Sequence, residues 1–127
     1  MNNHSGIIVI TNIDTQVIEL KEDRELTLDL LYEKLNCDTI EAVHIDVNNQ
    51  YLIVVDDSGL LKYDNFVNKY HWNNHNHITE RDFAGNIAIV KNVIDDEGVG
   101  NFGIMTPEEI NSVLDNFIVY YEISRLR

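Results

Sequence analysis

Three histidines stand close together between positions 71 and 77, in the segment HWNNHNH. In a helix His71 and His75 would share one face, and His77 could add a third imidazole from the loop. Imidazoles at that spacing suit zinc or nickel. No cysteine or carboxylate adjoins them in sequence, and an asparagine-rich polar loop can hold such a cluster by chance. A metal- or small-ligand-binding module centred on this loop is therefore kept as an alternative function.

Two acidic clusters, Asp56-Asp57 and Asp95-Asp96-Glu97, have the residue types of acid–base or metal sites. Each stands beside a glycine in a predicted turn, and turns favour Asp and Gly for backbone reasons. Cys37 follows a predicted helix end, where the dipole does not activate a thiol. The chain has no P-loop, HExxH, GxSxG or CxxC motif. The sequence therefore leans against an enzyme, offers no catalytic residue, and suggests no cofactor other than zinc or nickel at the histidines.

The charge is strongly unbalanced, with 22 acidic against 9 basic residues and a net charge of -13. Such a chain repels nucleic-acid phosphate and attracts basic protein surfaces, so we expect no direct nucleic-acid binding. Simple solubility is the plain explanation of the acidity. If the acidity is functional, the partner-binding candidates run from a charged connection onto the solvent face of a predicted helix: Glu22, Asp23, Glu25, Asp29 and Glu33.

Length and composition predict one domain over residues 1–127, with residues 1–5 flexible. No apolar run approaches the roughly 18 residues that a membrane helix needs. The polar start lacks the basic-then-apolar pattern of a signal peptide. A single cysteine cannot form an internal disulfide, which fits a reducing cytoplasm. We therefore expect a cytoplasmic protein without membrane contact, and the oligomeric state stays open.

Two main helices are predicted from capping residues and apolar spacing. Thr27 is a candidate N-cap for a helix to about Asn36, with an apolar stripe at positions 28, 31, 32 and 35. Thr106, Pro107 and Glu109 have the pattern of an N-cap, a first-turn proline and a capping-box glutamate. The second helix is expected to hold one apolar face for over three turns: Ile110, Val113, Leu114, Phe117, Ile118 and Tyr121.

Strands are predicted at 6–13, 16–20, 40–47, 51–55 and 85–93. The first two form a hairpin around a turn at 12–15, and 6–13 and 51–55 are apolar on both faces. A short helix capped by Asp64, through Phe66, Val67 and Tyr70, precedes the histidine loop, and 95–103 is an acidic, glycine-rich loop.

The order β-β-α-β-β-(α)-β-α predicts an α+β fold, with a mostly antiparallel sheet of about five strands and two main helices packed on one of its faces. One shared core is expected to contain Leu31, Leu35, Val43, Ile45, Ile53, Val55, Ile87, Ile89, Leu114, Phe117 and Ile118.

Several short motifs occur in a fixed order along the chain: Leu31-Tyr32-Glu33-Lys34-Leu35, Ile40-Glu41-Ala42-Val43, Asp56-Asp57-Ser58-Gly59, Leu60-Leu61, Asn68, Gly85 to Val90 and the helix start Thr106–Glu109. Over most of residues 7–120 this arrangement resembles a family of short phage and mobile-element proteins that is catalogued only as a domain of unknown function. The chain departs from the family pattern in its histidine-rich loop and in Asp57-Ser58, where an acid pair is commoner. The resemblance implies an intracellular protein made by a phage, prophage or plasmid, and its motifs are structural rather than mechanistic.

Charge and resemblance together favour a small acidic, non-enzymatic accessory protein that acts by binding a host or phage protein. An anti-defence inhibitor is one form of this function. It would imitate DNA and occupy a nucleic-acid-binding partner, which requires carboxylates spaced like phosphates on one face.

Overall fold

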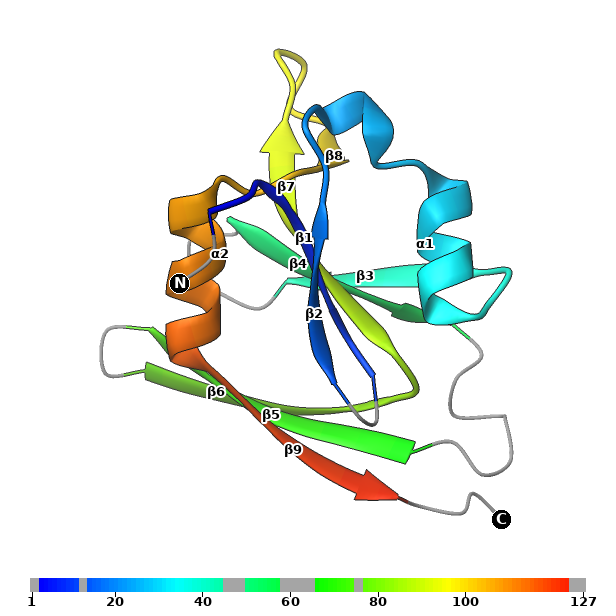
Figure 1. Ribbon diagram of the computed structural model, residues 1–127, viewed down its shortest axis with the longest axis vertical. Helices are drawn as coiled ribbons and strands as arrows, with labels where there is room; N and C mark the ends of the chain where they lie inside the picture. The colour runs from blue at the N-terminus through cyan, green and yellow to red at the C-terminus, as the bar shows by residue number, and fades with distance from the viewer. Residues whose placement is uncertain (1–2, 12–13, 45–49, 58–65, 75–76, 124–127) are drawn as a thin grey trace.

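The computed structural model describes residues 3–11, 14–44, 50–57, 66–74 and 77–123, with side chains for 3–11, 14–44, 50–57 and 85–116 (Figure 1). An antiparallel sheet of six strands has the order β2-β1-β7-β4-β3, and β8 also pairs with β7. Its strands are β1 (Gly6–Ile10), β2 (Thr15–Glu19), β3 (Ile40–His44), β4 (Tyr51–Asp56), β7 (Ile87–Ile94) and β8 (Gly100–Gly103). The predicted α+β class with a mostly antiparallel sheet is confirmed.

A second antiparallel sheet of three strands has the order β6-β5-β9. It contains β5 (Phe66–Asn74), β6 (His77–Ala84) and β9 (Phe117–Ile123). The helices are a short 3-10 helix η1 (Asp23–Glu25), α1 (Leu28–Leu35) and α2 (Pro107–Asn116). In Figure 1 the six-stranded sheet lies between α1 and α2, and the second sheet crosses below it. Strand β6 contacts β4, and α2 contacts both β5 and β9.

The six-stranded sheet has an apolar core on each face. Residues of β1, β4 and β7 alternate between the faces, and β1 and β4 are buried throughout. Around α2, one cluster holds Ile8, Ile10, Tyr51, Ile53, Val55, Ile87, Ile89, Met105, Ile110 and Val113. Under α1, the other holds Ile7, Val9, Leu20, Leu31, Leu35, Leu52, Val54, Ala88 and Val90.

The prediction of helices on one face with one shared core is therefore wrong. Strands that are apolar on both faces need cover on both, so Leu31 and Leu35 pack on the face opposite to Ile53 and Ile87. Val43 is only half-buried because β3 is an edge strand of the sheet.

Helix α1 is confirmed where the sequence placed it. The Thr27 hydroxyl accepts a hydrogen bond from the Leu30 amide at 3.1 Å, which satisfies a donor that the first turn leaves free. Asn36 ends the helix in the left-handed conformation, with φ of 53°. Leu31 and Leu35 are buried, while Leu28, at the edge of the predicted stripe, is exposed.

Helix α2 begins as predicted and ends early. Thr106 and Glu109 form a reciprocal capping box, with bonds of 3.0 and 3.2 Å between each backbone amide and the other side chain. The helix stops at Asn116, whose side-chain amide donates to the Ser112 carbonyl at 2.8 Å. The predicted extension through Phe117, Ile118 and Tyr121 is wrong, because that segment is strand β9.

Residues 117–123, FIVYYEI, are β-branched or aromatic at nearly every position, which favours a strand. Pairing with β5 satisfies the backbone groups on the side of this segment that faces β5. The spacing of apolar residues in this segment also fits the apolar face of α2, but pairing in the second sheet makes it a strand. Leu114, predicted to be in the core, is 39% exposed.

The helix predicted through Phe66, Val67 and Tyr70 is also wrong, because these positions belong to β5. Strands β5 and β6 pair from Val67–Ala84 to Asn74–His77, so a long hairpin replaces the predicted helix and most of the histidine loop. Here too, pairing with other strands, β6 and the distant β9, outweighs the helix preference indicated by the candidate cap at Asp64. Some predictions fall on residues outside those that the structure describes: Met1, Asn2, Asn12, Ile13, Ile45, Val47, Ser58 to Leu61, Asp64 and His75.

Candidate protein-binding surface

The five predicted acidic side chains are all exposed. Glu22, Asp23 and Glu25 lie at η1, whereas Asp29 and Glu33 follow in α1 and are one helical turn apart. The Glu25 carboxylate accepts hydrogen bonds from the backbone amides of Lys21 and Glu22 at 2.9 and 3.0 Å, and Glu22 pairs with Arg24. These contacts explain why a charged connection folds into a defined turn, since the carboxylates satisfy its free amides.

Asp23 connects η1 to a distant strand. One of its carboxylate oxygens accepts a hydrogen bond at 2.9 Å from the amide of Ile104, 81 positions away in sequence. Gly103 makes this approach possible, because a Cβ there would lie 2.3 Å from a Val93 methyl and 3.2 Å from the same Asp23 oxygen. The predicted acidic segment is thus held against β8.

The hairpin between β7 and β8 brings further carboxylates, which the sequence predicts as a turn cluster and not as partner-binding candidates. The Asp95 side chain accepts bonds from the amides of Glu97 and Val99, each at 2.9 Å. The Gly98 amide donates to the Asp95 carbonyl, and Gly98 has φ of 80°. This is a three-residue hairpin loop with glycine in the left-handed position. The predicted loop is confirmed at 95–99 and wrong at Gly100–Gly103, which is strand β8.

A local signal for that hairpin was present in the sequence. Asp-Asp-Glu-Gly places an amide-capping aspartate and a left-handed glycine at the spacing that such a loop needs. The apolar strand signal on its return side is weak, because β8 reads GNFG. Pairing with β7, rather than composition, makes this segment a strand.

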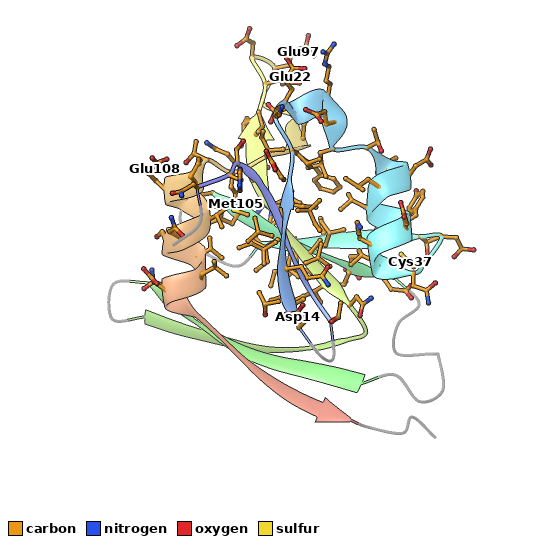
Figure 2. The ribbon with its side chains drawn as sticks, in the orientation of Figure 1. Asp14, Glu22, Cys37, Glu97, Met105 and Glu108 are labelled. Carbon is orange, nitrogen blue, oxygen red and sulfur yellow. The ribbon has the colours of Figure 1, made fainter. Side chains whose placement is uncertain are left out.

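We call residues 21–25 and 94–100 the acidic end. Together these two segments contain six acidic residues, with Lys21 and Arg24 as their only basic ones. Figure 2 shows Glu22 and Glu97 at the same end of the molecule, where the hairpin projects. Asp96 and Glu97 at its tip are exposed. The acidic end therefore brings carboxylates from two segments that are far apart in sequence to one end of the molecule.

Exposed carboxylates also occur away from this end. Figure 2 shows Asp14 near the opposite end and Glu108 on α2. Asp38 and Glu41, around β3, are exposed as well. Negative charge is therefore spread over the surface as well as gathered at the acidic end.

The histidines are placed at backbone level only. His71 lies in β5 opposite Glu80, and His77 begins β6 opposite Asn74. His77 is paired three positions from His71, so the two positions lie on opposite faces of the ladder, and the helical spacing that would have grouped His71 with His75 does not apply. Among the described side chains, no three His, Cys, Asp or Glu residues are grouped as a metal site requires. Zinc or nickel binding at 71–77 stays a prediction.

No protein-family model matches the chain, and neither the curated proteins nor the solved structures contain a significant match. Within the described residues, none of the helices combines the length and the apolar character needed to cross a membrane.

Proposed function

We propose that this chain is a non-enzymatic accessory protein of a phage or mobile element that acts in the host cytoplasm by binding a host or phage protein. The acidic end is the observation that carries this proposal. It joins the predicted residues Glu22, Asp23 and Glu25 to the hairpin carboxylates Asp96 and Glu97 through the Asp23–Ile104 hydrogen bond. Such a surface attracts a basic partner and repels nucleic acid.

The specific form that we propose is inhibition of a nucleic-acid-binding protein, as an anti-defence protein that imitates DNA would perform it. A protein that binds DNA offers Lys and Arg where phosphates dock, and these side chains also bind carboxylates. Asp29 and Glu33 extend the charge from η1 along α1 and are exposed. This supports a row of carboxylates rather than a single pair.

The first experiment is a pull-down with the full chain from the cytoplasm of cells that carry its gene, with the partner identified by mass spectrometry. A variant then replaces Glu22, Asp23, Glu25, Asp29 and Glu33 by their amides, which keep an acceptor oxygen. The net charge falls in magnitude from -13 to -8. A matched control makes the same charge change at five exposed positions elsewhere: Asp14, Asp38, Glu41, Glu108 and Asp115.

Binding to the purified partner should weaken steeply with salt, because attraction between exposed charges is screened within about 10 Å at 0.1 M. The first variant should slow association more than it speeds dissociation, and more than the control does, while both stay folded by circular dichroism. Duplex DNA should compete for the partner. Equal binding in high salt, equal effects of the two variants, or simultaneous binding of DNA would each contradict the proposal.

The alternative function, a metal- or small-ligand-binding module centred on His71–His77, has its own test. The observation behind it is the spacing of the three histidines in the sequence; the β5–β6 register puts positions 71 and 77 on opposite faces of the hairpin and adds nothing to it. Calorimetric titration of the full chain with zinc and then nickel would show saturable binding that is lost on replacing His71, His75 and His77 by alanine. A flat titration removes this alternative.

A further inference from the structure

The hairpin of β7 and β8 extends past the rest of the six-stranded sheet. Pairing with β1 ends at Ile89 and pairing with β4 ends at Lys91, whereas pairing with β8 continues to Ile94 and Gly100. Figure 1 shows this hairpin projecting from the top of the molecule. Every residue from 94 to 101 is exposed.

The projection is held in one shape by its own hydrogen bonds. Asp95 binds two amides of the turn, its own amide donates to the Val99 carbonyl at 3.0 Å, and Asp23 holds the base of β8 through Ile104. A hydrogen-bonded turn loses less conformational entropy when it docks than an unstructured loop would, which favours binding. The shape is therefore set before any partner is met.

Two large aliphatic side chains near the tip are exposed. Ile94 is 59% exposed and Val99 is 53% exposed. Asp95 and Gly98 specify the turn, so the fold does not require an aliphatic residue at either position. Val99 pairs with Asp95, whereas Ile94 pairs with Gly100, so the two aliphatic side chains occupy opposite faces of the hairpin. The tip is a thin wedge with an apolar contact on each side.

The negative charge of the hairpin tip limits which partner surfaces it can bind. Asp96 and Glu97 stand between the two aliphatic residues, and the sequence has no Lys or Arg from position 92 to 124. A second copy of this chain is disfavoured because each copy carries a net charge of -13. A flat apolar surface would leave the two carboxylates unpaired, which is costly when they are buried.

We infer that the β7–β8 hairpin inserts into a cleft of the partner protein whose floor carries Lys or Arg and whose two walls are apolar. Asp96 and Glu97 reach the basic floor, while Ile94 and Val99 each contact one wall. This inference rests on the proposed function and names the part of the acidic end that enters the partner. The cleft binds the wedge by two-sided packing, and the surrounding carboxylates guide the approach.

The test places a photo-crosslinking residue, p-benzoylphenylalanine, at Ile94 or at Val99 in the full chain. The probe is the heparin-retained protein fraction of cells that carry the gene. Ser112, exposed on α2, is the control position. Both hairpin positions should give adducts with one protein at least about tenfold above the control, with the two crosslinked peptides on opposite walls of a cleft that contains Lys or Arg.

Three results would overturn the inference: adducts from only one hairpin position, equal adducts from Ser112, or adducts between two copies of this chain. A partner that is retained through the carboxylates of η1 and α1, with no adduct at either hairpin position, would reject the wedge and leave the proposed function standing. A fraction that yields no salt-sensitive partner at all would reject both.

Variants of the hairpin separate its two contributions. Ile94→Ser with Val99→Ser should raise the dissociation rate about tenfold or more, and Asp96→Asn with Glu97→Gln should mainly slow association at low salt. Leu114→Ser is the matched control, because Leu114 is an exposed aliphatic residue on α2. If the serine pair binds as tightly as the control, the apolar walls are not part of the contact.

Discussion

The six-stranded sheet and the acidic end are held by different forces. In β1 and β4 every residue is buried, and apolar clusters cover both faces. In the acidic end residues 21–25 and 94–100 are all exposed, and its shape is defined by backbone amides that donate hydrogen bonds to the carboxylates of Asp23, Glu25 and Asp95. Burial of apolar side chains stabilises the six-stranded sheet, whereas hydrogen bonds between carboxylates and backbone amides specify the shape of the acidic end.

This difference shows where the chain can change without unfolding. A core position is constrained by its neighbours, since packed interiors tolerate little change in volume. An exposed position on a hydrogen-bonded turn is free of that constraint, so residues such as Ile94 and Glu97 can serve binding. Substitutions at Gly6, Leu35 and Thr106, each with its own comparison variants, test the contrast, beginning with the one that should cost the most.

Gly6→Ala should have the largest effect. A Cβ at Gly6 would lie 1.8 Å from the Ile18 carbonyl oxygen, and φ there is 152°. Because Gly6 also exchanges backbone hydrogen bonds with Met105, any shift would disturb the link between β1 and the α2 segment. We expect a loss of more than about 3 kcal/mol in the free energy of unfolding, measured by urea titration.

Gly98→Ala is the control for that substitution, because Gly98 has φ of 80° but nothing within 4 Å of an added Cβ. It should cost only about 1–2 kcal/mol, for the left-handed backbone alone. Equal losses for the two alanines would mean that the close approach at Gly6 does not constrain the sheet.

Leu35→Ala should cost about 2–5 kcal/mol, because it opens a cavity beneath α1 in a packed cluster. Ile94→Ala, at an exposed aliphatic position in the hairpin, should change stability by less than about 0.5 kcal/mol. Thermal and urea unfolding of both variants provide the comparison. A large loss for Ile94→Ala would show that the hairpin contributes to the core, and no loss for Leu35→Ala would show that α1 packs elsewhere.

Thr106→Ala should cost about 1 kcal/mol, less than Gly6→Ala or Leu35→Ala, through loss of the hydroxyl that accepts a hydrogen bond from the Glu109 amide. Thr106→Ser keeps that acceptor and should stay close to the parent. The same measurement on Thr27→Ala, which removes the cap of α1, should give a similar loss. If Thr106→Ser lost as much stability as Thr106→Ala, the loss would come from the threonine methyl group and not from the cap.

Several features of the fold were predictable because their causes are local. The threonine caps of both helices, the end of α1 near Asn36, and strands β1 and β4 each depend on residues a few positions apart. The exposure of the five candidate carboxylates was predictable for the same reason, since charged side chains in connections and on helix surfaces stay in water.

The candidate surface as a whole was not predictable. Asp23 and Ile104 are 81 positions apart, and no spacing within either segment indicates that they meet. The sheet brings them together, because β8 pairs with β7 and returns beside η1. The sequence therefore identified half of the acidic end, and the pairing of β8 supplied Asp96, Glu97 and the two aliphatic residues.

By itself, the sequence determined the class of the fold, the helix starts, the strands that are apolar on both faces, and the net charge of -13. Only the tertiary structure decided that α1 and α2 cover opposite faces, that 117–123 leaves the helix for β9, and that Phe66–Asn74 is a strand. Helix caps and the alternation of side chains along a strand depend on residues a few positions apart, so a single segment of sequence is enough to predict them. Strand pairing joins backbone groups that are far apart in the chain, and its hydrogen bonds can overrule the preference of either segment alone.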